Sequence, residues 1–232
     1  MSLRPRLFVA SLTVIAVTLS TTIAFAVIVP SRSRRFRVNY SRMSATWWQT
    51  MLSIPTPVNP LLDETGENCG EGQSGRVWFL AGNFGGSSVR SCTVSASKAI
   101  FFPVINAECS EVEEAAAGNP IPTAEEMRAC ADFLIDHVTE TEASIDGRPV
   151  NSQRIGRVQS PLFSFMLPED NILGIEDPDP NPSLAVSDGF WLFLSPLPAG
   201  EHVIHFRGVA PFPEFGFTFE TEVTYFLTVV DD

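Results

Sequence analysis

The chain has 232 residues, of which 44% are hydrophobic and 18% are charged, a composition typical of a globular protein with one sizeable core. Its formal net charge is −12 and its pI is about 4.6. An acidic chain of this kind is repelled by a phosphate backbone, which argues against nucleic acid as a partner.

Residues 1–26 predict a cleaved signal peptide. Arg4 and Arg6 precede a long uncharged run, and Ala24-Phe25-Ala26 has the small-x-small form that signal peptidase cleaves after. We therefore expect an exported protein that begins at Val27. The alternative is an uncleaved anchor, because the run is long enough to span a bilayer and several arginines follow it. Contact with a membrane would then be made by this segment.

Residues 27–42 are predicted to form a basic linker before a single domain at 43–232. All 27 acidic residues follow this segment, since the first of them is Asp63. The alternative is electrostatic contact of the linker with an anionic envelope or with the domain's own acidic face.

The run Ser44–Leu52 predicts a short helix, which Pro55 and Pro57 end. It carries the adjacent pair Trp47 and Trp48. Adjacent side chains cannot both face one core from a helix, so we expect one of them to be left for a partner or a sugar ring. The alternative is that both pack inside the domain.

The loop from Asn59 to Cys69 is rich in oxygen ligands, including Asp63 and Glu67. Calcium would accept such ligands, but the glycine falls too early in the acidic run for an EF-hand. The alternative is an ordinary turn held by hydrogen bonds from the backbone to an aspartate. No other cofactor is indicated.

The segment 76–109 predicts a β-meander. Two dense apolar runs, 77–81 and 99–102, are typical of strands buried on both faces, and they bracket a glycine-rich turn and a strand that carries Cys92.

The four cysteines are Cys69, Cys92, Cys109 and Cys130. An even number in a chain with an export signal indicates two disulfides, for which three connectivities are possible. The sequential pairing, Cys69 with Cys92 and Cys109 with Cys130, needs the least crossing of the meander. No Cys-x-x-Cys pair is present to favour a metal site.

A covering helix is predicted over about 123–139. Thr123 and Glu126 form a capping box, and an apolar stripe follows at helical spacing that places Cys130 on the buried face. The pairing of Cys109 with Cys130 would fix this helix to the sheet. His137 lies at the carboxyl end of this helix, where a positively charged imidazole would interact favourably with the negative end of the helix dipole.

Short strands fill the rest of the chain. Asp146-Gly147 predicts a hairpin turn, the run 157–167 contains Pro161 and predicts an edge or a bulge, and the last run, 217–229, alternates apolar and polar residues. The fold predicted is all-β, a mainly antiparallel β-sandwich with an immunoglobulin-like cadence in its carboxyl-terminal half and one inserted, disulfide-stapled helix.

Several motifs resemble a family of secreted, uncharacterised prokaryotic proteins. They are Trp47-Trp48-Gln49, Asn59-Pro60-Leu61-Leu62-Asp63, the run 72–82 with Gly-Gln-Ser-Gly-Arg-Val-Trp-Phe-Leu-Ala-Gly, and Phe101-Phe102-Pro103 with Asn106 and Glu108-Cys109. The likeness departs from the family's pattern at Ser95-Ala96-Ser97. The resemblance implies export and fold but no chemistry.

Three functions remain open. The first is a non-catalytic extracellular module that binds a glycan or a protein, with Trp47 or Trp48 as the contact. The second is a structural or assembly component of the cell envelope. The third is a hydrolase that uses Glu108 or Glu111, with His205 as a further candidate. A cavity where these carboxyl groups converge with a histidine would favour the hydrolase, and a rim of exposed aromatic residues would favour the binding module.

Overall fold

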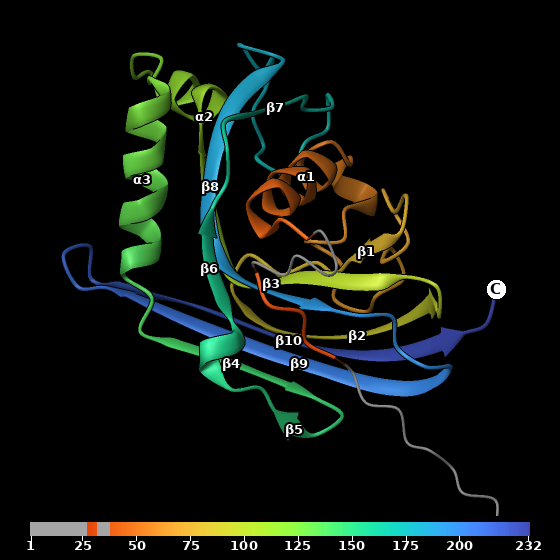
Figure 1. The fold of residues 1–232 in the computed structure, drawn as a ribbon. Helices are drawn as coiled ribbons and strands as arrows, with labels where there is room; N and C mark the ends of the chain where they lie inside the picture. Colours follow the sequence, from red (N-terminus) through yellow and green to blue (C-terminus); the bar gives the residue numbers. More distant parts are fainter. Residues whose placement is uncertain (1–26, 32–37) are drawn as a thin grey trace, which may run out of the picture.

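A computed structural model describes residues 27–31 and 38–232, and these residues form two facing five-stranded sheets (Figure 1). Sheet A contains β1 (Val77–Phe79), β3 (Ala99–Ser110), β8 (Ser183–Leu194) and β6 (Gly156–Gln159) in that order, and β7 (Phe163–Phe165) also pairs with β8. Sheet B contains β2 (Gly86–Ser95), β10 (Phe217–Val230), β9 (Gly200–Phe212), β4 (Glu140–Ile145) and β5 (Arg148–Pro149).

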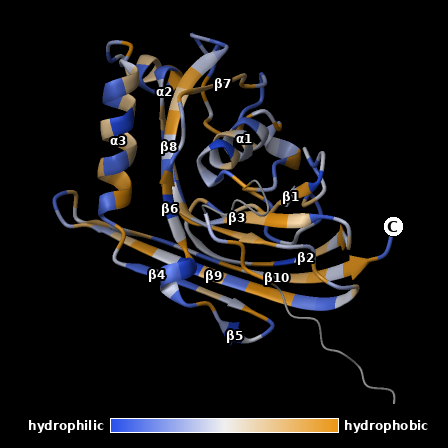
Figure 2. Ribbon diagram, in the orientation of Figure 1, coloured by the Kyte–Doolittle hydropathy of each residue, from blue (hydrophilic) through white to orange (hydrophobic). Residues whose placement is uncertain are grey.

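Three α-helices accompany the sheets. They are α1 (Tyr40–Leu52), α2 (Glu111–Ala116) and α3 (Ala124–Asp136), and short 3-10 turns occur at Thr56–Val58 and Ser152–Arg154. Helices α1 and α3 lie on opposite sides of β8 (Figure 1). In Figure 2, hydrophilic and hydrophobic residues alternate along α3, as expected for an amphipathic helix that covers a sheet.

The predicted β-sandwich with a disulfide-stapled helix is confirmed, but the predicted meander is wrong. Strands β1 and β3 pair in parallel within sheet A, whereas β2 lies in sheet B, parallel to β10. The burial patterns explain this separation. Strand β3 is buried along most of both faces, whereas β2 alternates between exposed and buried residues and suits a sheet with one solvated face. Both sheets are therefore mixed.

The core has two layers. Between the sheets, Phe102 and Leu192 of sheet A meet Phe206 and Tyr225 of sheet B. On the other face of sheet A, aromatic side chains pack under α1, and Phe101 and Trp191 stack in parallel with ring centroids 4.9 Å apart.

Both adjacent tryptophans of α1 belong to this second layer, which corrects the expectation that one of them stays outside the core. Trp47 is 0% and Trp48 is 7% exposed, and their rings meet edge to face at 5.0 Å. Helix α1 contacts the three strands β6, β7 and β8. Side chains on more than one side of the helix are therefore buried against sheet A.

Both disulfides have the predicted sequential pairing. Cys69 joins Cys92 and Cys109 joins Cys130, with Cα atoms 6.1 and 6.2 Å apart. The capping box of α3 is also confirmed, because Thr123 Oγ1 accepts a hydrogen bond from the Glu126 backbone and the Glu126 carboxylate accepts one from the Thr123 backbone.

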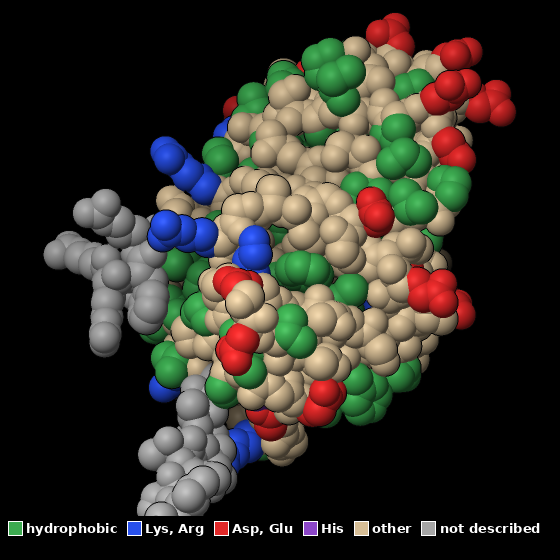
Figure 3. All heavy atoms as spheres, turned by 90° about the vertical axis from the view of Figure 1, so that its right-hand side faces the viewer, with side chains coloured by type: hydrophobic (Ala, Val, Ile, Leu, Met, Phe, Trp, Pro, Cys, Tyr) green, Lys and Arg blue, Asp and Glu red, His purple; other side chains and the backbone are tan. Residues whose placement is uncertain are grey.

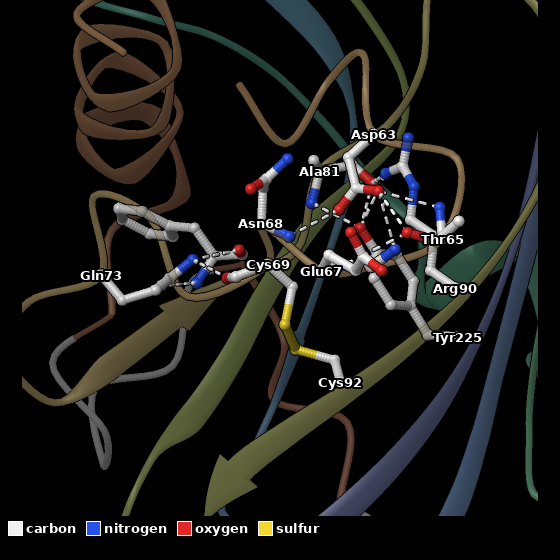
Figure 4. The surroundings of a disulfide bond; sticks show 12 residues. Asp63, Thr65, Glu67, Asn68, Cys69, Gln73, Ala81, Arg90, Cys92 and Tyr225 are labelled. Atoms are coloured by element: carbon white, nitrogen blue, oxygen red, sulfur yellow. Dashed lines mark hydrogen bonds between the residues drawn. A yellow bond between two sulfur atoms is a disulfide. The ribbon is translucent and has the colours of Figure 1, made fainter. Parts of the chain in front are cut away.

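The first disulfide lies beside a buried polar network (Figure 4). Arg90 is buried within the sandwich, and its Nη1 donates to the carbonyl oxygens of Ala81 and Gly82 and to the hydroxyl of Tyr225. Gln73 bonds both backbone groups of Phe79, which ties the cysteine-bearing loop to β1.

The strands after α3 agree with the sequence in most respects. The Asp146-Gly147 turn joins β4 to β5 with positive φ at both residues, as predicted. The run 157–167 divides around Pro161 into β6 and β7, which both pair with β8.

Part of the predicted linker is fixed to the domain. Val29 is buried, its backbone N–H donates to Phe193 O at 2.9 Å, and its carbonyl accepts the hydroxyl of Tyr40. The predicted signal peptide at 1–26 and residues 32–37 lie outside the described residues. Among the residues described, no helix is long and apolar enough to cross a membrane.

Candidate functional site

A cavity of about 280 Å³ runs along one edge of β3. The neighbouring strand β1 pairs only with Ala99–Phe101, so in the described part of the chain no strand pairs with the rest of this edge. The cavity is mostly apolar, and residues far apart in the chain line it: Trp48, Phe84, Ile105, Asn106, Ala107, Glu108, Glu113, Leu134, Ile135, Val138, Leu173, Ala210, Phe212, Phe217 and Phe219.

The cavity reaches both faces of sheet A. Four consecutive strand residues, 105–108, line it. Successive side chains of a strand point to opposite faces, so a single cavity can contact all four only if it straddles the free edge of the strand. Asn106 and Glu108 share the face covered by α1, and Ala107 shares the opposite face with Cys109, which is bonded to α3.

Three buried polar atoms in the lining have no hydrogen-bond partner among the described residues. They are Nε1 of Trp48, Nδ2 of Asn106 and Oε2 of Glu108. Two further atoms of this kind, Oγ of Ser187 and Nε1 of Trp191, belong to β8 beside the same layer. A buried polar group without a partner costs about 1–3 kcal/mol, so this concentration beside one cavity marks it as the candidate site.

The surroundings of Glu108 disfavour its charged form. Burial raises the pKa of Glu108 well above its usual range, and the charge of Glu113 together with a hydrogen bond between the two carboxyl groups raises it further. Glu113 in turn accepts a hydrogen bond from Ser110 Oγ at 2.6 Å. The two carboxyl groups therefore lie side by side in an apolar cavity, where the charged form of Glu108 is disfavoured.

Two glycines allow this part of β3 to pack closely. A Cβ atom on Gly189 of β8 would lie 2.6 Å from Asn106 Cβ, and one on Gly208 of β9 would lie 2.5 Å from Ile105 Cβ. Between these glycines β3 carries an irregularity, after Pro103, that shifts its register with β8. Asn106 can therefore approach β8 closely only because residue 189 is a glycine, and Ile105 can approach β9 closely only because residue 208 is a glycine.

Aromatic residues form the rim of the cavity. Phe84 and Phe217 are each 52% exposed, and Phe217 stacks on Phe212 with ring centroids 4.9 Å apart. Phe215, at the tip of the β9–β10 hairpin, continues this exposed surface. Apolar side chains of α3 close the cavity on the other side.

Of the three predicted catalytic candidates, the cavity contains one. Glu108 lines it, but Glu111 turns away and its carboxylate accepts a hydrogen bond from the Leu184 backbone at 3.0 Å. His205 points from the outer face of sheet B, where its Nε2 lies 3.0 Å from Glu222 Oε1. The acidic residues that follow β3 form the helix α2, and this helix brings Glu113, not Glu111, to Glu108.

The two predicted ligand contacts also have different places. Trp47 is a core residue whose indole donates to Leu80 O at 2.9 Å. Trp48 lines the cavity with its indole N–H unpartnered. Sequence reasoning missed Asn106 and Glu113. The signal for Asn106 was present, because two polar residues at i and i+2, Asn106 and Glu108, interrupt an otherwise apolar strand.

The calcium candidates lie elsewhere. The Asp63 carboxylate accepts hydrogen bonds from the backbone of Thr65, Gly66 and Asn68, as in the alternative of a capped turn (Figure 4). Burial alone would raise the pKa of Asp63, but these hydrogen bonds lower it below its usual value. Glu67 belongs to the same loop. No group of three or more metal-ligating side chains occurs among the residues that the structure describes.

The face over α1 is acidic along its upper and right-hand borders and carries most of its Lys and Arg side chains at the left (Figure 3).

Two disulfides, two mixed sheets and an apolar cavity at a sheet edge together define a disulfide-bonded β-sandwich with a ligand-sized site. Comparison of the chain with protein-family models, with curated proteins and with solved structures finds no match.

Proposed function

We propose that the chain is an exported, non-catalytic binding domain and that the cavity beside β3 is its binding site. The ligand is an apolar group that carries one polar group able both to accept and to donate hydrogen bonds. The single observation that carries this proposal is the set of three unpartnered polar atoms in an otherwise apolar cavity.

The chemistry of the three atoms defines the ligand's polar group. Trp48 and Asn106 each offer an N–H donor, whereas Glu108 offers the unpartnered carboxyl oxygen Oε2 as an acceptor. An amide, a carboxylic acid or a hydroxyl satisfies both kinds. A free sugar ring carries more hydroxyl groups than these atoms can serve, so a partner with an apolar group is favoured over a glycan.

Export is supported by the two disulfides, which persist in oxidising compartments, and by the predicted signal peptide. The resemblance to secreted prokaryotic proteins agrees with it. Intact mass of the exported protein should give a chain that begins at Val27. A membrane-bound product that retains Met1 would contradict cleavage.

Binding is tested with decanamide and decanol as probes. It is followed by the tryptophan fluorescence of the domain, in which Trp48 takes part, and by the melting temperature. We expect saturable binding that Asn106→Leu weakens, because this change removes a donor while it keeps the side-chain size. Phe226→Ala, on the outer face of sheet B and 48% exposed, is the matched control for Phe217→Ala at the rim. If Phe217→Ala and Phe226→Ala changed the affinity for the probes equally, the cavity would not be the binding site.

A second candidate function is supported by the carboxyl pair itself. Two adjacent carboxyl groups in an apolar cavity, one of them with a raised pKa, form an arrangement suited to general acid–base catalysis. Glu108→Gln and Glu113→Gln separate the two functions. If the domain only binds, neither variant changes a turnover. A hydrolytic turnover that both variants abolish, with unchanged melting temperature, would replace the binding proposal by an enzyme.

A further inference from the structure

We propose that the free edge of β3 at Ile105–Glu108 binds an extended segment of another polypeptide, which adds to sheet A as a further strand. This inference rests on the proposed function of the cavity and names the class of its ligand. The general mode requires an unpaired strand edge and pockets for alternate side chains, and both are present.

The first requirement is met by the end of strand pairing. Strand β1 stops opposite Phe101, and the last bond on this side is from the Leu80 backbone to Phe101 O at 3.1 Å. Beyond that point, the backbone of residues 103–108 bonds no strand other than β8 in the described part of the chain. Unpaired backbone groups of an edge strand bind the backbone of an added strand without regard to its sequence.

The second requirement is met because the cavity straddles the edge. An extended segment placed along β3 points alternate side chains to the two faces of sheet A. On the face of α3, they meet apolar walls that include Ile135, Val138 and Phe212. On the face of α1, they lie beside Trp48, Asn106 and Glu108, each of which has a buried polar atom without a partner among the described residues.

The expected sequence of the partner follows from these two faces. Positions toward α3 should be apolar, and positions toward α1 should carry an amide or a hydroxyl, because these groups can bond both the N–H donors and Oε2 of Glu108. A carboxylate at these positions would be repelled by the Glu108–Glu113 pair and by the net charge of the chain.

A second copy of this chain fits the edge poorly. Pairing of two β3 edges would bring together two cavities that each contain Glu108 and Glu113, in chains that each carry a net charge of −12, and like charges repel. We therefore assign the edge to a segment of a different protein, with alternating apolar and amide or hydroxyl side chains.

The test uses a displayed library of short peptides in which apolar residues alternate with Asn, Gln, Ser or Thr, selected against the disulfide-bonded domain. The selected peptide is then synthesised with backbone N-methyl groups on one alternate set of residues, or on the other set. An added strand directs only one set of N–H groups to β3. We therefore expect methylation of that set to lower the affinity about tenfold or more and methylation of the other set to leave it unchanged.

Protein variants locate the binding. Asn106→Leu should lower the affinity for the peptide, whereas Phe226→Ala should leave it unchanged. Circular dichroism and the melting temperature report whether each variant is folded. Equal tolerance of both methylated sets would overturn strand addition. Decanamide binding without any selected peptide would overturn the polypeptide partner and leave the cavity as a binding site. Failure of both probes would overturn both proposals. A dimer in sedimentation equilibrium that Asn106→Lys dissociates would make a second copy the occupant.

Discussion

Glu108 of β3 lies directly across from Ser187 of β8, and each residue has a buried side-chain oxygen without a hydrogen-bond partner among the described residues. Cross-strand pairs of this kind normally satisfy each other or pack apolar atoms. Glu108 lines the cavity and Ser187 lies directly behind it in β8, so these unpartnered groups are next to the candidate site.

The pH dependence of stability should report on Glu108. The folded state holds the proton of Glu108 to a higher pH than the unfolded chain, where the pKa is about 4.3. The stability that this proton contributes is fully present below the unfolded pKa and is lost as pH rises through the folded pKa. We expect Glu108→Gln to flatten the decline of melting temperature above about pH 4.3. An unchanged profile would show that Glu108 ionises normally.

Two serines of β8 provide a matched pair for the cost of unpartnered groups. Ser187 Oγ is buried without a partner, whereas Ser183 Oγ accepts a hydrogen bond from the Val112 backbone at 3.1 Å. Ser187→Ala should stabilise the ligand-free domain by about 1–3 kcal/mol, and Ser183→Ala should destabilise it by about 1 kcal/mol. Urea unfolding measures both, and changes of the same sign would contradict the assignment.

Close approach at Gly189 should be essential to the cavity. Gly189→Ala places a methyl group against the Cβ and Cα of Asn106, at 2.6 and 2.9 Å, so that β3 must shift. We expect a loss of about 1–3 kcal/mol in stability and weaker decanamide binding. Gly70→Ala is the control, because a Cβ atom there meets nothing within 4 Å. Similar losses in the two variants would contradict this role.

The second disulfide should contribute measurably to stability. Cys109 and Cys130 are separated by 21 residues, and closing a loop of this length is worth about 3 kcal/mol by the chain-entropy estimate. The double variant Cys109→Ala with Cys130→Ala should lose about this amount in urea unfolding. Peptide mapping of the unmodified protein should recover the pairs described above, and a peptide that joins Cys92 to Cys109 would refute the connectivity.

Local patterns determined much of this protein. The capping box at Thr123, the positive-φ turn at Asp146-Gly147 and the alternation of the last strand depend on residues close in sequence, and each was readable without the fold. The sequential disulfides followed because loops of about 20 residues join neighbouring elements.

Only the tertiary structure decided which strands share a sheet and which polar residues share a cavity. The prediction of a meander was wrong because the sheet to which β2 and β3 belong depends on their pairing with β10 and β8, which lie far along the chain. Glu113 reaches Glu108 because α2 turns back beside β3, and Trp48 reaches Asn106 because α1 packs on the same face of sheet A. These approaches are set by packing between distant segments, for which sequence spacing carries no signal.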